Sequence, residues 1–294
     1  MEMISVIIPS YNRADTIKRS VQSVLNQTYS DFEIIIVDDD SKDNTEEIVS
    51  KLNDSRISYH KNDTNMGACA SRNLGIEKAK GKFIAFQDSD DEWLPEKLKE
   101  QISFLIKINC DLVFCSMERI SGKKKEIYPP FTPDNKTDFF KQSLYENYTS
   151  TQTILGKKEV FEKAKFDERM PRFQDWELML RISRGYNIKF LDKVLVKSYI
   201  QENSISLNSG SAVSALKIIY DIHKEAIIVN KKINQRFHIK IAEYMLANGK
   251  NPKKYYKKAY QLIFSIKLFL FYVACSASLH KFLFKVKQSY FRFR

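Results

Sequence analysis

Short runs of β-branched and other apolar residues, each followed closely by proline or aspartate, most constrain how this chain can fold. Residues 5–8 stop at Pro9, and residues 33–37 and 82–86 are each followed within two residues by a group of aspartates. Strands that are apolar at nearly every position are buried on both faces, which is typical of parallel sheets covered by helices. Similar runs at residues 57–60 and 112–115 bring the predicted strands to five.

Segments with helical spacing of apolar residues separate these strands. Ile17, Val21 and Val24 share one helical face, for example. The alternation predicts βαβ units, and so an α/β fold with an open, mostly parallel sheet and helices on both faces. We predict this domain over residues 1–212 and a helical extension over residues 213–294. Ligands bind such sheets at the carboxyl ends of the strands, so both groups of aspartates are expected to face one crevice.

The group Asp88-Ser89-Asp90-Asp91 follows the predicted strand at residues 82–86. Two carboxylates at positions i and i+2 can share a hard divalent cation, and Mg²⁺ or Mn²⁺ prefers such oxygen ligands and often bridges to phosphates. A solvated acidic turn is the alternative interpretation. Taken alone, a pair of aspartates with this spacing is a weak indication of metal binding.

The group Asp38-Asp39-Asp40 follows the strand at residues 33–37. Three adjacent acids repel one another, so a ligand or the amino end of a helix is expected to compensate their charge. One of them is expected to belong to a capping loop before the next helix. Another is free to accept hydrogen bonds from a base or a ribose hydroxyl.

Asp175 lies beside Trp176 in a predicted helix. A large aromatic neighbour can desolvate a carboxyl and raise its pKa toward the range of a general base. The alternative is an ordinary acid at the amino end of a helix, and the local pattern by itself favours that alternative.

Several motifs are absent from the sequence. The eight glycines form neither a dinucleotide-binding fingerprint nor a phosphate-binding P-loop, and the four histidines are too scattered to suggest a catalytic triad. None of the four cysteines belongs to a C-x-x-C pair, which disfavours a zinc site or a disulfide framework. The first residues lack the basic segment of a signal peptide, so a cytoplasmic location is expected.

Positive charge is concentrated at the carboxyl end of the chain. Residues 250–294 contain nine Lys, two Arg and no Asp or Glu, a charge of +11, so the other residues carry +1 of the net +12. This indicates an anionic surface contacted by residues 251–294. The apolar stretch at 268–279 would form a helix of about 18 Å, shorter than the roughly 20 residues that span a bilayer.

An interfacial helix on an anionic membrane is therefore the preferred interpretation of the tail. A spanning helix that includes Lys267, or docking on the α/β domain or a partner protein, remains an alternative. A nucleic-acid-binding tail is disfavoured because the rest of the chain is nearly neutral and shows no recognition motif. We therefore expect no nucleic-acid partner.

Four ordered blocks, at residues 5–13, 37–41, 65–73 and 81–91, together resemble the family 2 glycosyltransferases with the nucleotide-sugar-binding GT-A fold. The block Gln174-Asp175-Trp176-Glu177 fits as well, so the resemblance covers about residues 3–205. Each block is weak alone, and their order and spacing make the combination specific. The sequence has Asp40 where the family often has Gly or Asn, and Gln174 where it often has Glu.

The resemblance implies a role for each matching position. Tyr11 and Pro9 would border the nucleotide base, Asp39 would hydrogen-bond it, and Arg72 would reach the base or the diphosphate. Asp88 would contact the ribose or the metal, Asp90 would bind Mn²⁺ or Mg²⁺, and Asp175 would be the catalytic base. The implied nucleotide-sugar-binding residues are Pro9, Tyr11, Arg13, Asp39, Gly67, Arg72, Asp88 and Ser89.

The implied reaction is inverting transfer of one sugar from a UDP- or dTDP-sugar to an acceptor hydroxyl. The Gln-x-x-Arg-Trp motif of processive members is absent, because neither tryptophan follows an arginine. The basic tail suits a lipid-linked glycan acceptor, as used in surface polysaccharide assembly. A sugar-phosphate nucleotidyltransferase is the runner-up, but residues 5–13 contain no glycine, whereas that class usually has a glycine-rich loop there.

Overall fold

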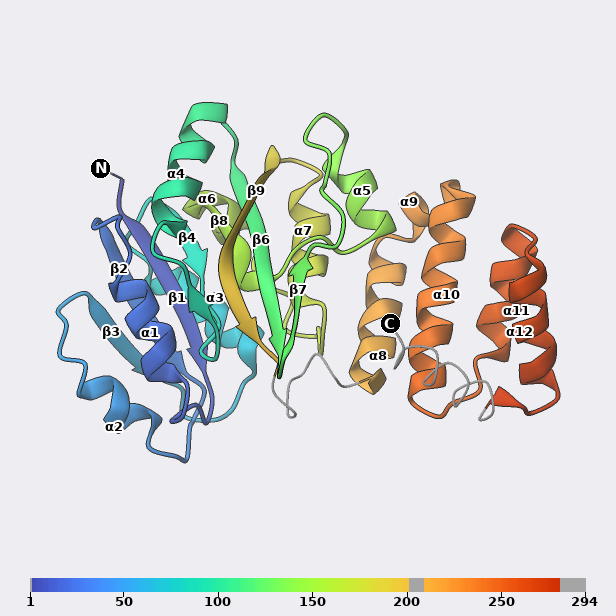
Figure 1. Ribbon diagram of the computed structural model, residues 1–294, viewed down its shortest axis with the longest axis horizontal. Coiled ribbons are helices and arrows are strands. Elements are labelled where there is room, and N and C mark those ends of the chain that lie inside the picture. The colour runs from blue at the N-terminus through green and yellow to red at the C-terminus, as the bar shows by residue number, and fades with distance from the viewer. Residues whose placement is uncertain (1, 201–208, 281–294) are drawn as a thin grey trace. The chain divides into compact units, whose positions relative to one another are not determined.

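The computed structural model describes residues 2–200 and 209–280, which form two compact units (Figure 1). The first unit comprises Met1–Glu168 and Gln174–Gln201, and the second comprises Arg169–Phe173 and Glu202–Arg294.

The first unit is built on a sheet of nine strands in the order β3-β2-β1-β4-β8-β6-β9-β5, with β7 paired to β6. The strands are β1 (Ile4–Ser10), β2 (Phe32–Asp38), β3 (Ile57–Lys61), β4 (Phe83–Phe86), β5 (Glu92–Trp93), β6 (Leu112–Ser121), β7 (Lys124–Tyr128), β8 (Ile154–Lys157) and β9 (Ile188–Tyr199). All five strands predicted from the sequence are present.

Strands β3, β2, β1 and β4 are parallel neighbours. Their side chains alternate between two cores: Ile4, Val6 and Ile8 enter one, and Ile7 enters the other. Both faces are therefore buried, which explains why these strands are apolar at nearly every position.

The sheet becomes mixed beyond β4. Strand β8 pairs antiparallel with both β4 and β6, so β6 does not adjoin β4, and β9 then pairs parallel with β6. The irregular segment at 116–150 supplies the end of β6, strand β7 and helix α5 (Phe139–Tyr145). Strands β8 and β9 are not followed by a group of aspartates, unlike β2 and β4.

Helices cover both faces of the sheet, which confirms the predicted α/β class (Figure 1). One core takes in side chains from α1 (Ile17–Leu25) and α4 (Lys97–Ile108). The other takes in side chains from α3 (Ala68–Lys78), α6 (Lys158–Lys163) and α7 (Gln174–Ile182). Helix α2 (Thr45–Ser50) and the short 3-10 turn η1 (Thr151–Thr153) complete this unit.

The second unit is helical. Its helices are α8 (Ser209–Ile222), α9 (Lys224–Val229), α10 (Lys231–Ala247), α11 (Lys253–Leu262) and α12 (Ile266–Ser276). In its described part, up to residue 280, the basic tail contains the short helices α11 and α12; residues 281–294 lie outside the described residues. Across the described ranges, no helix combines the length and the apolar character needed to cross a bilayer.

Candidate active site

The parallel strands β1, β2 and β4 deliver the predicted site residues to one edge of the sheet. Ser10 at the end of β1 is in register with Asp38 at the end of β2, and the Ser10 carbonyl accepts a 2.8 Å hydrogen bond from the Asp39 amide. Pro9 lies past the point where pairing with β4 ends, so its missing N–H removes no bond from the ladder. Tyr11 follows, with 44% of its surface exposed.

The three aspartates after β2 have different environments. Asp38 is fully buried and accepts hydrogen bonds from the Ser41 amide and the Tyr59 hydroxyl. Burial, and then the bond to Asp38, raise the pKa of Tyr59. Asp40 has a left-handed backbone with φ of 67° and forms a 2.6 Å ion pair with Lys42.

Asp39 holds the loop that leads into α3. Its carboxylate accepts hydrogen bonds from the Asn62 side chain (2.9 Å), the Met66 amide (2.8 Å) and the Gly67 amide (2.7 Å). Gly67 has φ of 90°, a conformation that favours glycine, immediately before the first residue of α3. The loop is thus fixed directly to the edge of the sheet.

Arg72 of α3 connects two segments that are distant in sequence. Its Nη2 donates a 2.8 Å hydrogen bond to Asp88 Oδ1, and its Nη1 donates a 2.8 Å bond to Gln174 Oε1. The arginine side chain is 7% exposed. Its buried Nε has no hydrogen-bond partner among the described residues. One guanidinium therefore joins the acid group after β4 to the first residue of α7.

The acid group after β4 lies among arginines. Asp90 Oδ2 is 3.7 Å from Arg13 Nη2, and the Asp90 carbonyl accepts a hydrogen bond from the Arg19 side chain. Burial, and then the charge of Asp88, raise the pKa of Asp90. Ser89, which lies between Asp88 and Asp90 in the sequence, is buried.

Asp91 is buried, and its carboxylate links this loop to two other segments of the chain. Its carboxylate accepts a 3.0 Å bond from the Tyr199 amide and a 2.7 Å bond from the Gln152 side chain. Burial raises the pKa of Asp91 well above its ordinary value, with Asp88 and Asp90 adding to the effect.

Asp175 lies in the first turn of α7, next to Gln174. Its Oδ1 accepts a 2.8 Å bond from the Trp176 amide, and the Trp176 indole donates a 2.7 Å bond to the Ser143 carbonyl. Burial raises the pKa of Asp175 to about 6, although the Trp176 amide, Arg72 and Arg119 act in the opposite direction.

Comparison with known proteins identifies the family. The sequence matches glycosyl transferase family 2 over residues 5–166, more than half of the chain.

The chain belongs to glycosyl transferase family 2.

Relatives of this glycosyltransferase cover most of the chain. An Escherichia coli protein named UDP-Glc:alpha-D-GlcNAc-diphosphoundecaprenol beta-1,3-glucosyltransferase WfgD is 44% identical over 209 residues, which is 70% of this chain and 80% of that protein. The Rickettsia prowazekii glycosyltransferase RP339 is 33% identical over 274 residues, or 88% of this chain and 83% of that protein.

Solved structures share the fold of this glycosyltransferase. S. aureus TarS 1-349 in complex with UDP-GlcNAc has a TM-score of 0.66 at 20% identity, covering all of this chain and 93% of that chain. The mannosyltransferase PcManGT from Pyrobaculum calidifontis, in complex with GDP-Man and Mn²⁺, has a TM-score of 0.60 at 15% identity, covering 97% and 83%. The predicted GT-A fold is confirmed.

The structure brings two further residues of the glycosyltransferase near Asp175 that the sequence did not indicate. Arg119 on β6 lies 3.7 Å from the centre of the Tyr128 ring on β7. The charge of Arg119 opposes the burial that raises the pKa of Asp175. Burial, and then the charge of Asp175, raise the pKa of Tyr128. Both residues come from the segment at 116–150, whose sequence pattern carries no signal for the site.

Proposed function

We propose that this chain transfers a single sugar from a UDP- or dTDP-sugar to a hydroxyl of a lipid-linked saccharide, with inversion at the anomeric carbon. The Arg72 bridge carries the proposal, because one guanidinium holds both Asp88 and the residue next to Asp175. A donor diphosphate near Asp88 and an acceptor hydroxyl near Asp175 would then be adjacent, as single displacement requires.

The donor would occupy the edge formed after β1 and β2. The exposed ring of Tyr11 would contact the nucleotide base, with Pro9 shaping the wall beside it. Asp39 would hydrogen-bond the base through acceptor capacity beyond its three loop contacts, since a carboxylate offers about four lone-pair sites. Gly67 would allow close approach of the backbone, and Ser89 would support the ribose end of the site.

The diphosphate would lie among Arg13, Arg72 and the pair Asp88 and Asp90. Burial, and then the charge of Asp88, raise the pKa of Asp90, and a pair of neighbouring carboxylates fits Mn²⁺ or Mg²⁺. The described residues include no group of three or more His, Cys, Asp or Glu side chains that could hold a metal ion; Asp88 and Asp90 would hold the cation as a pair. When bound, the cation would neutralise negative charge developing on the leaving diphosphate.

Asp175 would act as the general base. With a pKa of about 6, its carboxyl is mostly ionised near neutral pH and still basic enough to take a proton. Because Oδ1 already accepts the Trp176 amide, Oδ2 is left for the acceptor hydroxyl. The hydroxyl oxygen would bond to C1 as the bond from C1 to the diphosphate oxygen breaks, and the hydroxyl proton would pass to Oδ2. Attack opposite the leaving group inverts C1.

The lipid-linked acceptor is proposed from two observations. The relative WfgD is named for a diphosphoundecaprenol-linked substrate, and residues 250–294 of this chain carry a charge of +11 with no acidic residue. We accordingly propose peripheral association with the cytoplasmic membrane through residues 251–294.

The test is a panel of nucleotide sugars given to the purified chain with Mn²⁺ or Mg²⁺ and a short-chain lipid-diphosphate saccharide. The expected result is release of a nucleoside diphosphate together with an acceptor heavier by one sugar, measured by mass spectrometry. Release of pyrophosphate would instead identify a nucleotidyltransferase. Absence of transfer from every donor would overturn the proposal.

A further inference from the structure

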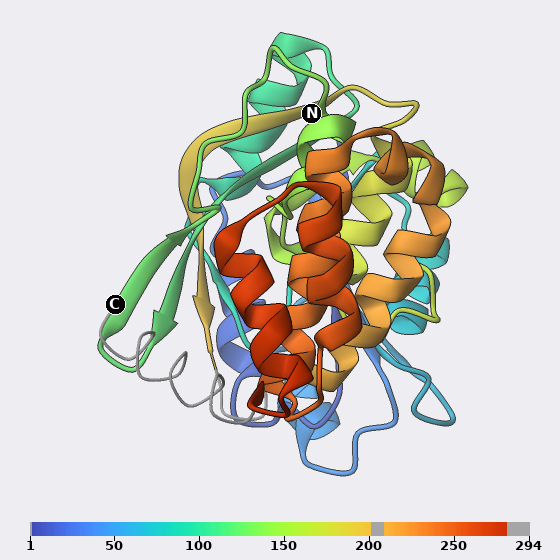
Figure 2. The same cartoon turned by 90° about the vertical axis from the view of Figure 1, so that its right-hand side faces the viewer.

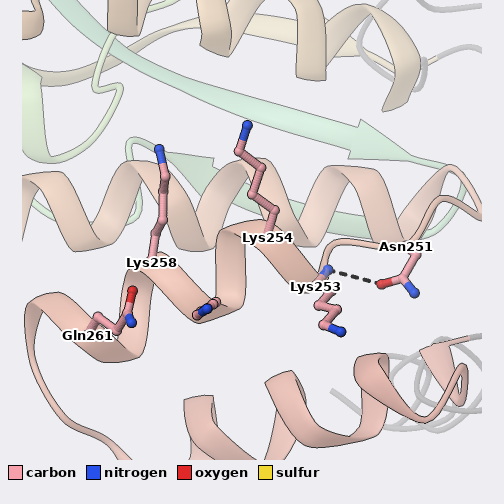
Figure 3. A pocket seen from close by; sticks show the side chains of 6 residues that line it. Asn251, Lys253, Lys254, Lys258 and Gln261 are labelled. Atoms are coloured by element: carbon pink, nitrogen blue, oxygen red, sulfur yellow. Dashed lines mark hydrogen bonds between the residues drawn. The ribbon is translucent and has the colours of Figure 1, made fainter.

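Four lysines of α11 line an open hollow of about 610 Å³ (Figure 3). The lining residues are Asn251, Lys253, Lys254, Lys257, Lys258 and Gln261. The lysines recur at i and i+4, which places them on the exposed side of the helix, while Tyr256 and Ala259 are buried on the other. Figure 3 shows Lys254 and Lys258 extending in the same direction. No acidic side chain lines the hollow within the described part of the chain.

Helix α12 leaves an apolar stripe exposed. Ile266, Phe269, Leu270 and Val273 are 68%, 40%, 58% and 44% exposed, at the spacing i, i+3, i+4 and i+7 that defines one helical face. The opposite face buries Leu268 and Cys275. Phe269 also packs against the Tyr260 ring of α11, with the ring centres 5.6 Å apart. An apolar face that stays 40–68% exposed marks an interaction surface.

The lysine hollow and the apolar stripe belong to one hairpin. Helices α11 and α12 lie side by side (Figure 2), with the rings of Tyr256 and Phe271 5.3 Å apart. The Asn251 side chain donates a 2.9 Å hydrogen bond to the Cys275 carbonyl at the far end of α12. Lys253 lies 5.9 Å from the Tyr272 ring, which brings the edge of the lysine group next to α12.

We propose that this hairpin docks on an anionic phospholipid bilayer, with the lysines binding headgroup phosphates and the stripe of α12 entering the acyl boundary. The inference rests on the proposed action on a lipid-linked acceptor and assigns the membrane contact to specific residues. A cationic surface beside an apolar helical face is complementary to an anionic interface, which offers negative charge above hydrocarbon.

Other occupants fit less well. A second copy of the chain would bring two lysine groups toward each other, and the like charges would oppose association. A nucleic acid would use the lysines but would leave the aliphatic side chains of Ile266, Leu270 and Val273 unpartnered, because bases stack on aromatic rings.

The charge arm of the test uses the full-length chain and vesicle flotation. Vesicles that contain phosphatidylglycerol are expected to bind the wild-type chain, and vesicles of phosphatidylcholine alone are not. The triple variant Lys254→Gln/Lys257→Gln/Lys258→Gln is expected to bind about 100-fold more weakly, because each lysine contributes at an anionic surface. A matched control removes three exposed lysines from the first unit, Lys78→Gln/Lys107→Gln/Lys163→Gln, and should retain binding.

The apolar arm uses Ile266→Ser/Leu270→Ser, which leaves every charge in place. It is expected to weaken binding about tenfold or more at about 0.5 M NaCl, where screening leaves the apolar contribution dominant. Circular dichroism of each variant establishes that its helices are retained. Equal flotation of wild-type and triple-lysine chains would overturn the proposal. Tighter binding to a DNA fragment than to anionic vesicles, lost in the same lysine variant, would also overturn it.

Docking and catalysis are separated by measuring transfer to a short-chain, water-soluble acceptor. Hairpin variants are expected to transfer sugar to this acceptor at the wild-type rate, because none of the substituted residues belongs to the active site. A chain that binds vesicles but transfers no sugar would refute the proposed function and leave the docking inference standing. A chain that transfers sugar but floats with no vesicle would refute the docking inference and leave the proposed sugar transfer standing.

Discussion

Replacing Asp175 by Asn tests the proposed base through both stability and activity. The carboxyl has a pKa of about 6 in the folded chain against an ordinary value of 3.8, a difference worth about 3 kcal/mol. Asp175 is partly exposed, so solvent screening reduces the expected effect on stability to about 1–2 kcal/mol. The Asn oxygen can still accept the Trp176 amide, so the fold of the helix turn is retained.

The sign of the stability effect follows from the raised pKa. The folded chain binds the proton on Asp175 more tightly than the unfolded chain does. The protonated carboxyl therefore adds to the unfolding free energy below its ordinary pKa of 3.8, and this stabilisation is lost as pH rises through about 6. Relative to wild type, Asp175→Asn should therefore gain about 1–2 kcal/mol in unfolding free energy between about pH 4 and pH 7.5. Urea denaturation at both pH values measures this change.

Activity should move in the opposite direction. Asp175→Asn is expected to bind the donor normally and to lose about 10²- to 10⁴-fold in transfer rate, because no group remains to take the acceptor proton. The wild-type kcat/KM should fall below a pH of about 6 as the carboxyl becomes protonated. Asp192→Asn, at an exposed position of β9, is the matched control and should change neither quantity.

Two results would refute this reasoning. Wild-type transfer by Asp175→Asn would mean that another group removes the proton. A stability difference that does not change with pH would mean that Asp175 is not desolvated, and the physical basis of its assignment would be lost.

The remaining predictions concern the metal pair, the arginine bridge and the packing of α3. Asp90→Ala should lower metal-dependent turnover about 100-fold or more, measured by titrating Mn²⁺, and wild-type turnover would exclude Asp90 as a ligand. Arg72→Met should lower the unfolding free energy by about 2 kcal/mol and raise the donor KM; an unchanged KM would remove Arg72 from the donor site. Gly75→Ala would bring a Cβ to 2.4 Å from Ile7 Cγ2 and should cost about 1–3 kcal/mol by urea denaturation. Gly185→Ala meets nothing within 4 Å and serves as the control; equal stability of the two glycine variants would contradict the packing.

The sequence by itself determined the fold class, the family and the edge of the sheet that carries the site. Strands that are apolar at nearly every position need both faces buried, which a helix-covered sheet provides. The residues that follow parallel strands then lie at one common edge of the sheet. The positions of Asp39 and Asp88 at that edge were therefore predictable, because each follows a strand whose apolar residues identify it in the sequence.

Only the tertiary structure decided which side chains meet across the site. Arg72 and Gln174 are 102 positions apart, and their contact depends on how α3 and α7 pack against the sheet. Strand order also placed β8 between β4 and β6, and the β6–β7 hairpin delivered Arg119 near Asp175. A local sequence pattern reports only how each element is buried along its own length. These contacts depend on how elements far apart in the sequence pack together, so no local pattern predicts them.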